Sequence, residues 1–233
     1  MLTVTQKADG ERVLTARLGE ATVDTDLIGR LESVLDNVER GGIENFVLMF
    51  SGGPESVIGD FPSWPPGPGR SDMRYFARWD EMLSRISRLK AKTFAGYHGR
   101  VGAAAVQAGL VVDLRLASAQ AWLSLGSLPE GRFPGMGAYW LPKFVGLGTA
   151  RRIFLLGEDL TADDAARLGL VDALGDTLEA VVEKSIKALR AVTAESACFT
   201  RRILDGCYLL EHAAAVELAK AARYKVGMPD DDD

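Results

Sequence analysis

The sequence has only two cysteines and two histidines among its 233 residues, which limits the sites it can build. Cys198 and Cys207 lie nine residues apart in a segment that we predict to be helical. At about 1.5 Å of rise per residue they would be roughly 13 Å apart, too far for a disulfide. We therefore expect both thiols to be reduced, as in a cytoplasmic protein. So few thiols and imidazoles also argue against a metal site.

Long apolar runs and an excess of positive charge are also lacking. No apolar run approaches the roughly 20 residues that cross a bilayer, and no signal peptide opens the sequence. Lys and Arg number 27 against 32 Asp and Glu, which gives a formal net charge of −5. We therefore expect no membrane partner and no nucleic-acid partner, although a local basic pocket for one phosphorylated ligand remains open. A hydrophobic content of 47% is ordinary for a soluble globular protein.

The first 50 residues alternate between strand and helix patterns. Residues 12–18 alternate polar and apolar side chains, which predicts a half-buried strand. Residues 24–39 place apolar side chains at helical spacing, and Gly41-Gly42 ends that helix. Residues 46–50 form a continuous apolar run, which is typical of a strand buried on both faces. This order predicts an α/β architecture.

The rest of the chain divides into an α/β core and a helical end. Residues 61–69 hold four prolines and two glycines and form either a surface loop or a flap over a site. Thr161 with Asp164 indicates a capped helix start. We expect a core over residues 1–194 and a helical region with a disordered acidic tail over 195–233. Further helices are predicted near 71–89, 147–156, 162–168, 178–192 and 195–224, and further strands near 93–97, 112–117 and 122–125.

Three short motifs between residues 93 and 172 then carry a family resemblance. Residues 113–118 read DLRLAS, residues 155–162 read LLGEDLTA, and residues 166–172 read ARLGLVD. In this order and spacing they resemble the core of the crotonase superfamily, the enoyl-CoA hydratases and isomerases. The resemblance implies a crotonase (ClpP/crotonase-like) ββα superhelix with an α-helical C-terminal region. It also implies a homotrimer or hexamer.

The resemblance further implies chemistry through a thioester enolate. Two main-chain N–H groups would point at the developing oxyanion, one from a loop and one from a helix start. The first maps to Ile58, next to Gly59, and the second to Ala104, where the family prefers glycine. Alternatively, the small residues 102–105 simply pack a helix tightly against the sheet.

The sequence departs from the family at both hydratase glutamates. Those positions hold Gln107 and Ser127, and neither side chain can act as the carboxylate that activates water. Each is either a hydrogen-bonding group for substrate or water, or a satisfied polar residue. Ordinary hydration is therefore not expected. Other acid–base candidates are Asp60, Glu130, Tyr139 and His98, where a histidine is more often a hydrogen-bonding core residue.

Two functions stay open on this basis. The first is an enzyme acting on an acyl-CoA or acyl-carrier thioester, by decarboxylation or dehydration, with the coenzyme A thioester as substrate and no cofactor. Loss of CO2 creates the enolate itself, so this reaction needs no strong base. The turn at 134–139 resembles crotonases of polyketide and peptide-antibiotic biosynthesis. The second is an accessory subunit that assists a partner biosynthetic enzyme such as a polyketide synthase.

Overall fold

A computed structural model describes residues 2–7, 12–53, 56–62, 73–126, 134–206 and 214 of the chain. The strands are β1 (Leu2–Lys7), β2 (Val13–Leu18), β3 (Asn45–Ser51), β4 (Lys92–His98), β5 (Arg100–Val101), β6 (Leu114–Ser118), β7 (Trp122–Leu123), β8 (Leu160–Thr161) and β9 (Ala173–Gly175). The helices are α1 (Thr25–Arg40), α2 (Met73–Arg88), α3 (Ala103–Gly109), α4 (Gly137–Val145), α5 (Leu147–Leu156), α6 (Ala162–Arg167), α7 (Leu178–Ala188) and α8 (Ala194–Gly206).

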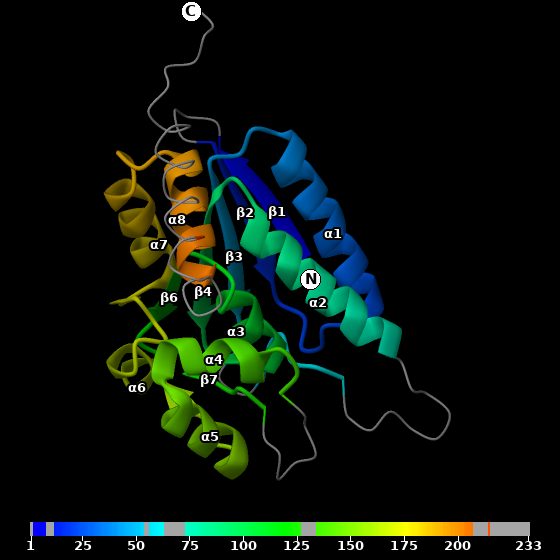
Figure 1. Cartoon of the computed structure of the whole chain (residues 1–233), viewed down its shortest axis with the longest axis vertical. Coiled ribbons are helices and arrows are strands. Elements are labelled where there is room, and N and C mark those ends of the chain that lie inside the picture. Colours follow the sequence, from blue (N-terminus) through cyan, green and yellow to red (C-terminus); the bar gives the residue numbers. More distant parts are fainter. Residues whose placement is uncertain are drawn as a thin grey trace, which may run out of the picture.

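The main sheet has six strands in the order β1-β2-β3-β4-β6-β9. Only β1 is antiparallel to its neighbour, and the other pairs are parallel, so helical crossovers connect them. A second, small sheet joins β5, β7 and β8. Figure 1 shows α1 and α2 side by side over the main sheet, with α7 and α8 at its other end. The α/β prediction is confirmed.

Strand β3 is buried on both faces, as its apolar run predicts. Phe46, Leu48 and Phe50 belong to the large core that includes the apolar sides of α1 and α2. Val47 and Met49 belong to a second cluster with residues of α7. Successive side chains of a strand point to opposite faces, so this division follows directly from the period of two. The sheet is therefore covered by helices on both sides.

Two helices begin at residues whose side chains cap the first turn. The Asp24 side chain accepts a hydrogen bond from the Leu27 N–H at 2.7 Å and starts α1. Thr161 accepts from the Asp164 N–H at 3.1 Å and starts α6, as predicted. Helix α4 escapes sequence-based prediction because Pro142 lies inside it and breaks the expected pattern.

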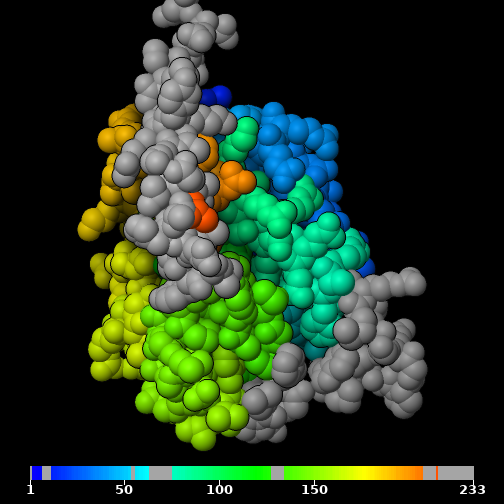
Figure 2. Space-filling view, viewed as in Figure 1, coloured from blue at the N-terminus to red at the C-terminus, as the bar shows by residue number. Residues whose placement is uncertain are grey.

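Helices α4 and α5 project from the sheet and form the lower end of the molecule in Figure 2. Helix α5 buries Ala150, Ile153 and Phe154. Its outer side carries Leu155 and Leu156, which are 58% and 65% exposed. An exposed apolar stripe of this kind marks a surface that a partner can cover.

Helix α8 is fixed to the core by a buried arginine. The Arg201 guanidinium is 5% exposed and donates to the Asp113 carboxylate at 2.7 Å and the Thr93 hydroxyl at 2.6 Å. It also donates to the main-chain carbonyls of Ser87 and Leu89. These bonds satisfy nearly every guanidinium donor, which a buried cation requires. They join α8 to the end of α2 and to the first residues of β4 and β6.

We predict that Arg201→Met lowers the free energy of unfolding by about 3–5 kcal/mol, because it leaves the Asp113 carboxylate without its cation. Denaturant unfolding followed by circular dichroism measures this change. The matched control is Arg202→Met, since Arg202 is the next residue of α8 and its side chain is exposed. Equal losses in the two variants would show that the buried ion pair does not hold α8.

Candidate functional site

The loop of residues 56–62 touches the start of α3 so closely that glycine is required on both sides. A Cβ on Gly102 would lie 2.5 Å from the Cβ of Asp60, and one on Gly59 would lie 2.7 Å from the Cβ of Ala105. Gly59 also has φ +70°, a conformation that favours glycine. The main chains of the loop and of α3 therefore meet directly, without side chains between them.

The first main-chain N–H groups of α3 have mostly local partners. Ala103 N–H donates to the Asp60 carboxylate at 3.3 Å, and Ala105 N–H donates to the Gly59 carbonyl at 2.8 Å. Val106 N–H donates to the Gly102 carbonyl at 3.1 Å. Ala104 is fully buried, and its N–H has no acceptor among the described residues. A buried donor without a partner is costly and rare in proteins. Of the N–H groups of residues 103–106, that of Ala104 is thus the one without an acceptor among the described residues.

The two amides of the predicted loop donor are already hydrogen-bonded. Ile58 N–H donates to the Arg100 carbonyl at 2.9 Å, in a bridge between Ile58 and Val101. Gly59 N–H donates to the Glu20 carbonyl, also at 2.9 Å. The expectation of a free donor at Ile58 or Gly59 is therefore corrected for this structure. The physical reason is that two carbonyls from other segments, Arg100 of β5 and Glu20 before α1, approach the loop, which the local sequence does not reveal.

Asp60 is part of the frame of α3. One carboxylate oxygen accepts from the N–H groups of Phe61 at 2.9 Å and Ala103 at 3.3 Å. A carboxylate at a helix start is favoured by the exposed N–H groups there. Nearby, the buried Tyr75 hydroxyl donates to the Val23 carbonyl. Burial raises the pKa of Tyr75 well above its usual value, and the charges of Asp24 and Asp60 raise it further.

Gln107 is buried and engaged at both ends of its amide. Its Oε1 accepts from the Trp79 indole N–H at 3.2 Å, and its Nε2 donates to the Pro134 carbonyl at 2.8 Å. Gly137 lies against it, since a Cβ there would come within 3.2 Å of Nε2. Gln107 thus ties α3 to α2 and to the turn before α4. Of the two alternatives left open by the sequence, these contacts match the satisfied polar residue.

Trp79 is a neighbour of Gln107 that sequence reasoning missed. Trp79 is 1% exposed and lies on the apolar side of α2, where its helical spacing indicates only a core residue. Nothing in that pattern signals the hydrogen bond from its indole N–H. Asp80 follows it on α2, and burial raises the pKa of its carboxyl.

Comparison with known proteins gives the family. The enoyl-CoA hydratase/isomerase profile matches residues 67–209. The chain belongs to this family. A probable enoyl-CoA hydratase of Bacillus subtilis is 29% identical over 172 residues, which cover 72% of this chain and 66% of that protein. The chain therefore spans about two thirds of this curated relative.

Solved structures confirm the crotonase fold of this family member. An enoyl-CoA hydratase of Thermoplasma volcanium superimposes with a TM-score of 0.83 at 20% identity, covering 97% of this chain and 92% of the other. An enoyl-CoA hydratase of Bacillus anthracis gives 0.82 at 17% identity, covering 98% and 92%. At these identities the likeness establishes the fold.

The remaining predicted residues of this family member fall in different places. His98 Nδ1 lies 2.8 Å from the Ser118 hydroxyl and forms a hydrogen bond between β4 and β6. Tyr139 is 40% exposed on α4, and its ring contacts the Lys143 ammonium at 4.1 Å. Ser127 and Glu130 lie outside the described residues, as do residues 63–69 of the possible flap.

The described residues include a free thiol, but no cluster of metal ligands and no membrane-spanning helix. Cys198 is a buried free thiol, and Cys207 lies outside the described residues. In the part of the chain that the structure covers, no three metal-ligating side chains gather. No helix there has the length and apolarity needed to cross a bilayer.

We predict that Gln107→Glu destabilises the protein in a pH-dependent way. An ionised carboxylate would face the Pro134 carbonyl, whereas the protonated acid can donate to it, so the folded state raises the pKa of the new group. Relative to the unmodified protein, the loss is small below the unfolded value of about 4.3. It grows to about 1–3 kcal/mol as the pH rises through the raised pKa.

The difference in unfolding free energy between the variant and the unmodified protein, measured at pH 4 to 8, tests this prediction. Gln107→Met serves as the control, because it removes both hydrogen bonds without adding a titrating group. Its deficit is expected to stay level over the same range. A level deficit for Gln107→Glu as well would contradict the assigned hydrogen bonds.

Proposed function

We propose that this chain binds an acyl-CoA or acyl-carrier thioester with the thioester carbonyl oxygen at the Ala104 amide. The observation that carries the proposal is the buried Ala104 N–H, which has no acceptor among the described residues although its helix neighbours are all satisfied. A carbonyl oxygen would supply that acceptor. As the oxygen gains charge in an enolate, the same hydrogen bond becomes stronger.

Hydration by paired carboxylates does not fit the site. Gln107 is neutral, and both ends of its amide are occupied by Trp79 and Pro134. Rotating it toward a bound water would leave a buried indole N–H and a carbonyl unpaired, at about 1–3 kcal/mol each. The side chain is therefore better suited to holding α2, α3 and the turn at Pro134 together than to proton transfer.

Decarboxylation fits these groups better. The bond between the α-carbon and the departing carboxylate breaks, and its electron pair forms the thioester enolate while CO2 leaves. Water then protonates the α-carbon. No protein base is needed, because bond cleavage itself generates the enolate. Dehydration remains the second reaction type in this proposal. The proposed setting is polyketide or peptide-antibiotic biosynthesis, which the turn at 134–139 supports.

A second candidate function is an accessory subunit, favoured by the occupied loop amides. Ile58 and Gly59 both donate within the chain, so one donor is left where the family chemistry uses two. Loss of one oxyanion donor typically lowers kcat by about 10²–10³-fold. A chain that binds the thioester but turns it over very slowly could act by presenting it to a partner such as a polyketide synthase.

We predict that the protein decarboxylates malonyl- or methylmalonyl-CoA but does not hydrate crotonyl-CoA. Ala104→Pro, which removes the N–H, should lower kcat by about 10²-fold or more. Chromatography of the CoA products gives the rate, and the infrared frequency of the bound thioester carbonyl reports the hydrogen bond directly. The frequency should rise toward its value in water-free solvent in the variant.

Ala103→Pro is the matched control, because it removes the neighbouring N–H, which donates to Asp60, and leaves the Ala104 amide in place. Binding of the CoA thioester without any turnover, with the carbonyl shift intact, would favour the accessory function. Hydration of crotonyl-CoA at ordinary enzyme rates would overturn the first proposal.

We further propose that the protein is a homotrimer or hexamer. The exposed Leu155 and Leu156 of α5 support an apolar contact between copies. Light scattering should give three or six times the 25.1-kDa chain mass. Leu155→Lys is expected to shift the mass toward that of the monomer if α5 lies in the contact, with Leu174→Lys on β9 as the control.

A further inference from the structure

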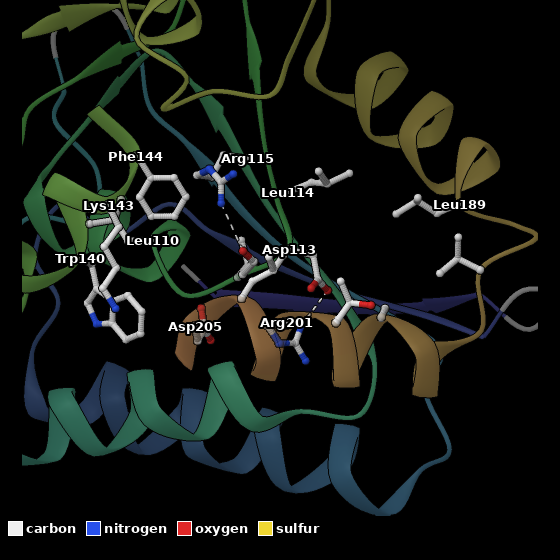
Figure 3. Close-up of a pocket in the computed structure, with 15 residues that line it drawn as sticks. Leu110, Asp113, Leu114, Arg115, Trp140, Lys143, Phe144, Leu189, Arg201 and Asp205 are labelled. Carbon is white, nitrogen blue, oxygen red and sulfur yellow. Dashed lines mark hydrogen bonds and ion pairs between the residues drawn. The ribbon is translucent and has the colours of Figure 1, made fainter. Parts of the chain in front are cut away.

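A cavity of about 490 Å³ lies at the C-terminal end of α3, away from the Ala104 amide. It is bordered by the start of β6, by α4, by α8 and by the segment after α7 (Figure 3). Its volume is in the range that holds small molecules in proteins. Its apolar walls come from Leu110, Val112, Leu114, Phe144, Leu189 and Leu204.

Two arginines in the wall of this cavity are paired with acids. Arg201 bonds to Asp113 at 2.7 Å, as Figure 3 shows. Arg115 bonds to Asp172 at 2.6 Å, and its guanidinium lies 4.4 Å from the centre of the Phe144 ring. Arg115 is 5% exposed, yet its Nε has no hydrogen-bond partner. One buried donor of a cation is therefore left unused.

Lys143 adds a second cation with an unused donor. Its Nζ is buried without any hydrogen-bond partner and lies 4.1 Å and 4.2 Å from the ring centres of Tyr139 and Trp140. Cation–π contacts attract an ammonium but accept none of its three N–H bonds in the usual way. In Figure 3 Lys143 and Trp140 lie together on one side of the cavity.

Asp205 on α8 is the nearby acid that could balance Lys143. No hydrogen bond or ion pair joins it to another of the described residues. Burial raises the pKa of its carboxyl, while Lys143 and Arg201 act in the opposite direction. A direct Lys143–Asp205 ion pair is thus not formed, and no described acid makes an ion pair with the ammonium.

We propose that this cavity binds a small carboxylic acid with an apolar body, its carboxylate engaging Lys143 Nζ and Arg115 Nε. A carboxylate accepts several hydrogen bonds at once, and Lys143 and Arg115, each with one buried donor atom that has no partner, both line the same cavity. The apolar walls take the hydrocarbon part. The site is separate from the Ala104 amide, since it lies at the opposite end of α3.

Hexanoate and hexanamide, which share one hydrocarbon body, test the proposal on the full chain. Saturation-transfer NMR titrations should show hexanoate binding about tenfold or more tightly than hexanamide, as expected for a hydrogen bond to a charged group. Lys143→Met should abolish this preference while hexanamide binding stays within about twofold. Lys184→Met, an exposed lysine on α7, is the control and should keep the preference.

A thermal melt of Lys143→Met first establishes that the variant folds. Arg115→Lys gives a second variant, which removes Nε and retains a positive charge; it should weaken hexanoate binding about tenfold.

Hexanoate binding that persists at saturating CoA thioester supports a separate site. Competition between the two ligands, equal affinity for acid and amide, or an unchanged preference in Lys143→Met would each overturn the proposal.

Discussion

The direct main-chain contact between residues 58–60 and the start of α3 determines what the rest of the site can do. Gly59 and Gly102 allow the two backbones to interlock, because any Cβ would collide with Ala105 or Asp60. The loop then supplies acceptors for the N–H groups of Ala103 and Ala105, whereas the Ala104 N–H has no acceptor among the described residues. The same contact therefore fixes the start of α3 and determines which of its main-chain N–H groups has no acceptor among the described residues.

Gln107 extends this constraint from the helix start to the neighbouring elements. An amide can be both donor and acceptor inside a core, whereas an ionised carboxylate can only accept. Here the Gln107 amide uses both capacities, since it accepts from Trp79 of α2 and donates to Pro134, and it is therefore a structural link. A neutral amide also avoids the cost of burying a charge beside a carbonyl.

Local sequence signals predicted the frame of the fold but only part of the site. The apolar run in β3, the Asp24 cap and the Thr161 cap depend on neighbouring residues and were predictable. The partners of Ile58 and Gly59 were not, because the Arg100 and Glu20 carbonyls approach from other segments. Helix α4 was missed because Pro142 contradicts its propensity and packing overrides it. The family resemblance singled out Ala104 and Gln107, and the structure shows the hydrogen bonds of Gln107 and an Ala104 N–H without an acceptor among the described residues.

Helix α3 contributes to two places of different character. Near its start the Ala104 N–H has no acceptor among the described residues, while at its C-terminal end Arg115 and Lys143 line a cavity with apolar walls. Gln107 binds Pro134, which stands three residues before α4, and Lys143 lies on α4 itself. A short stretch of chain, from Pro134 through α4, thus connects the hydrogen bond of Gln107 to the wall of this cavity.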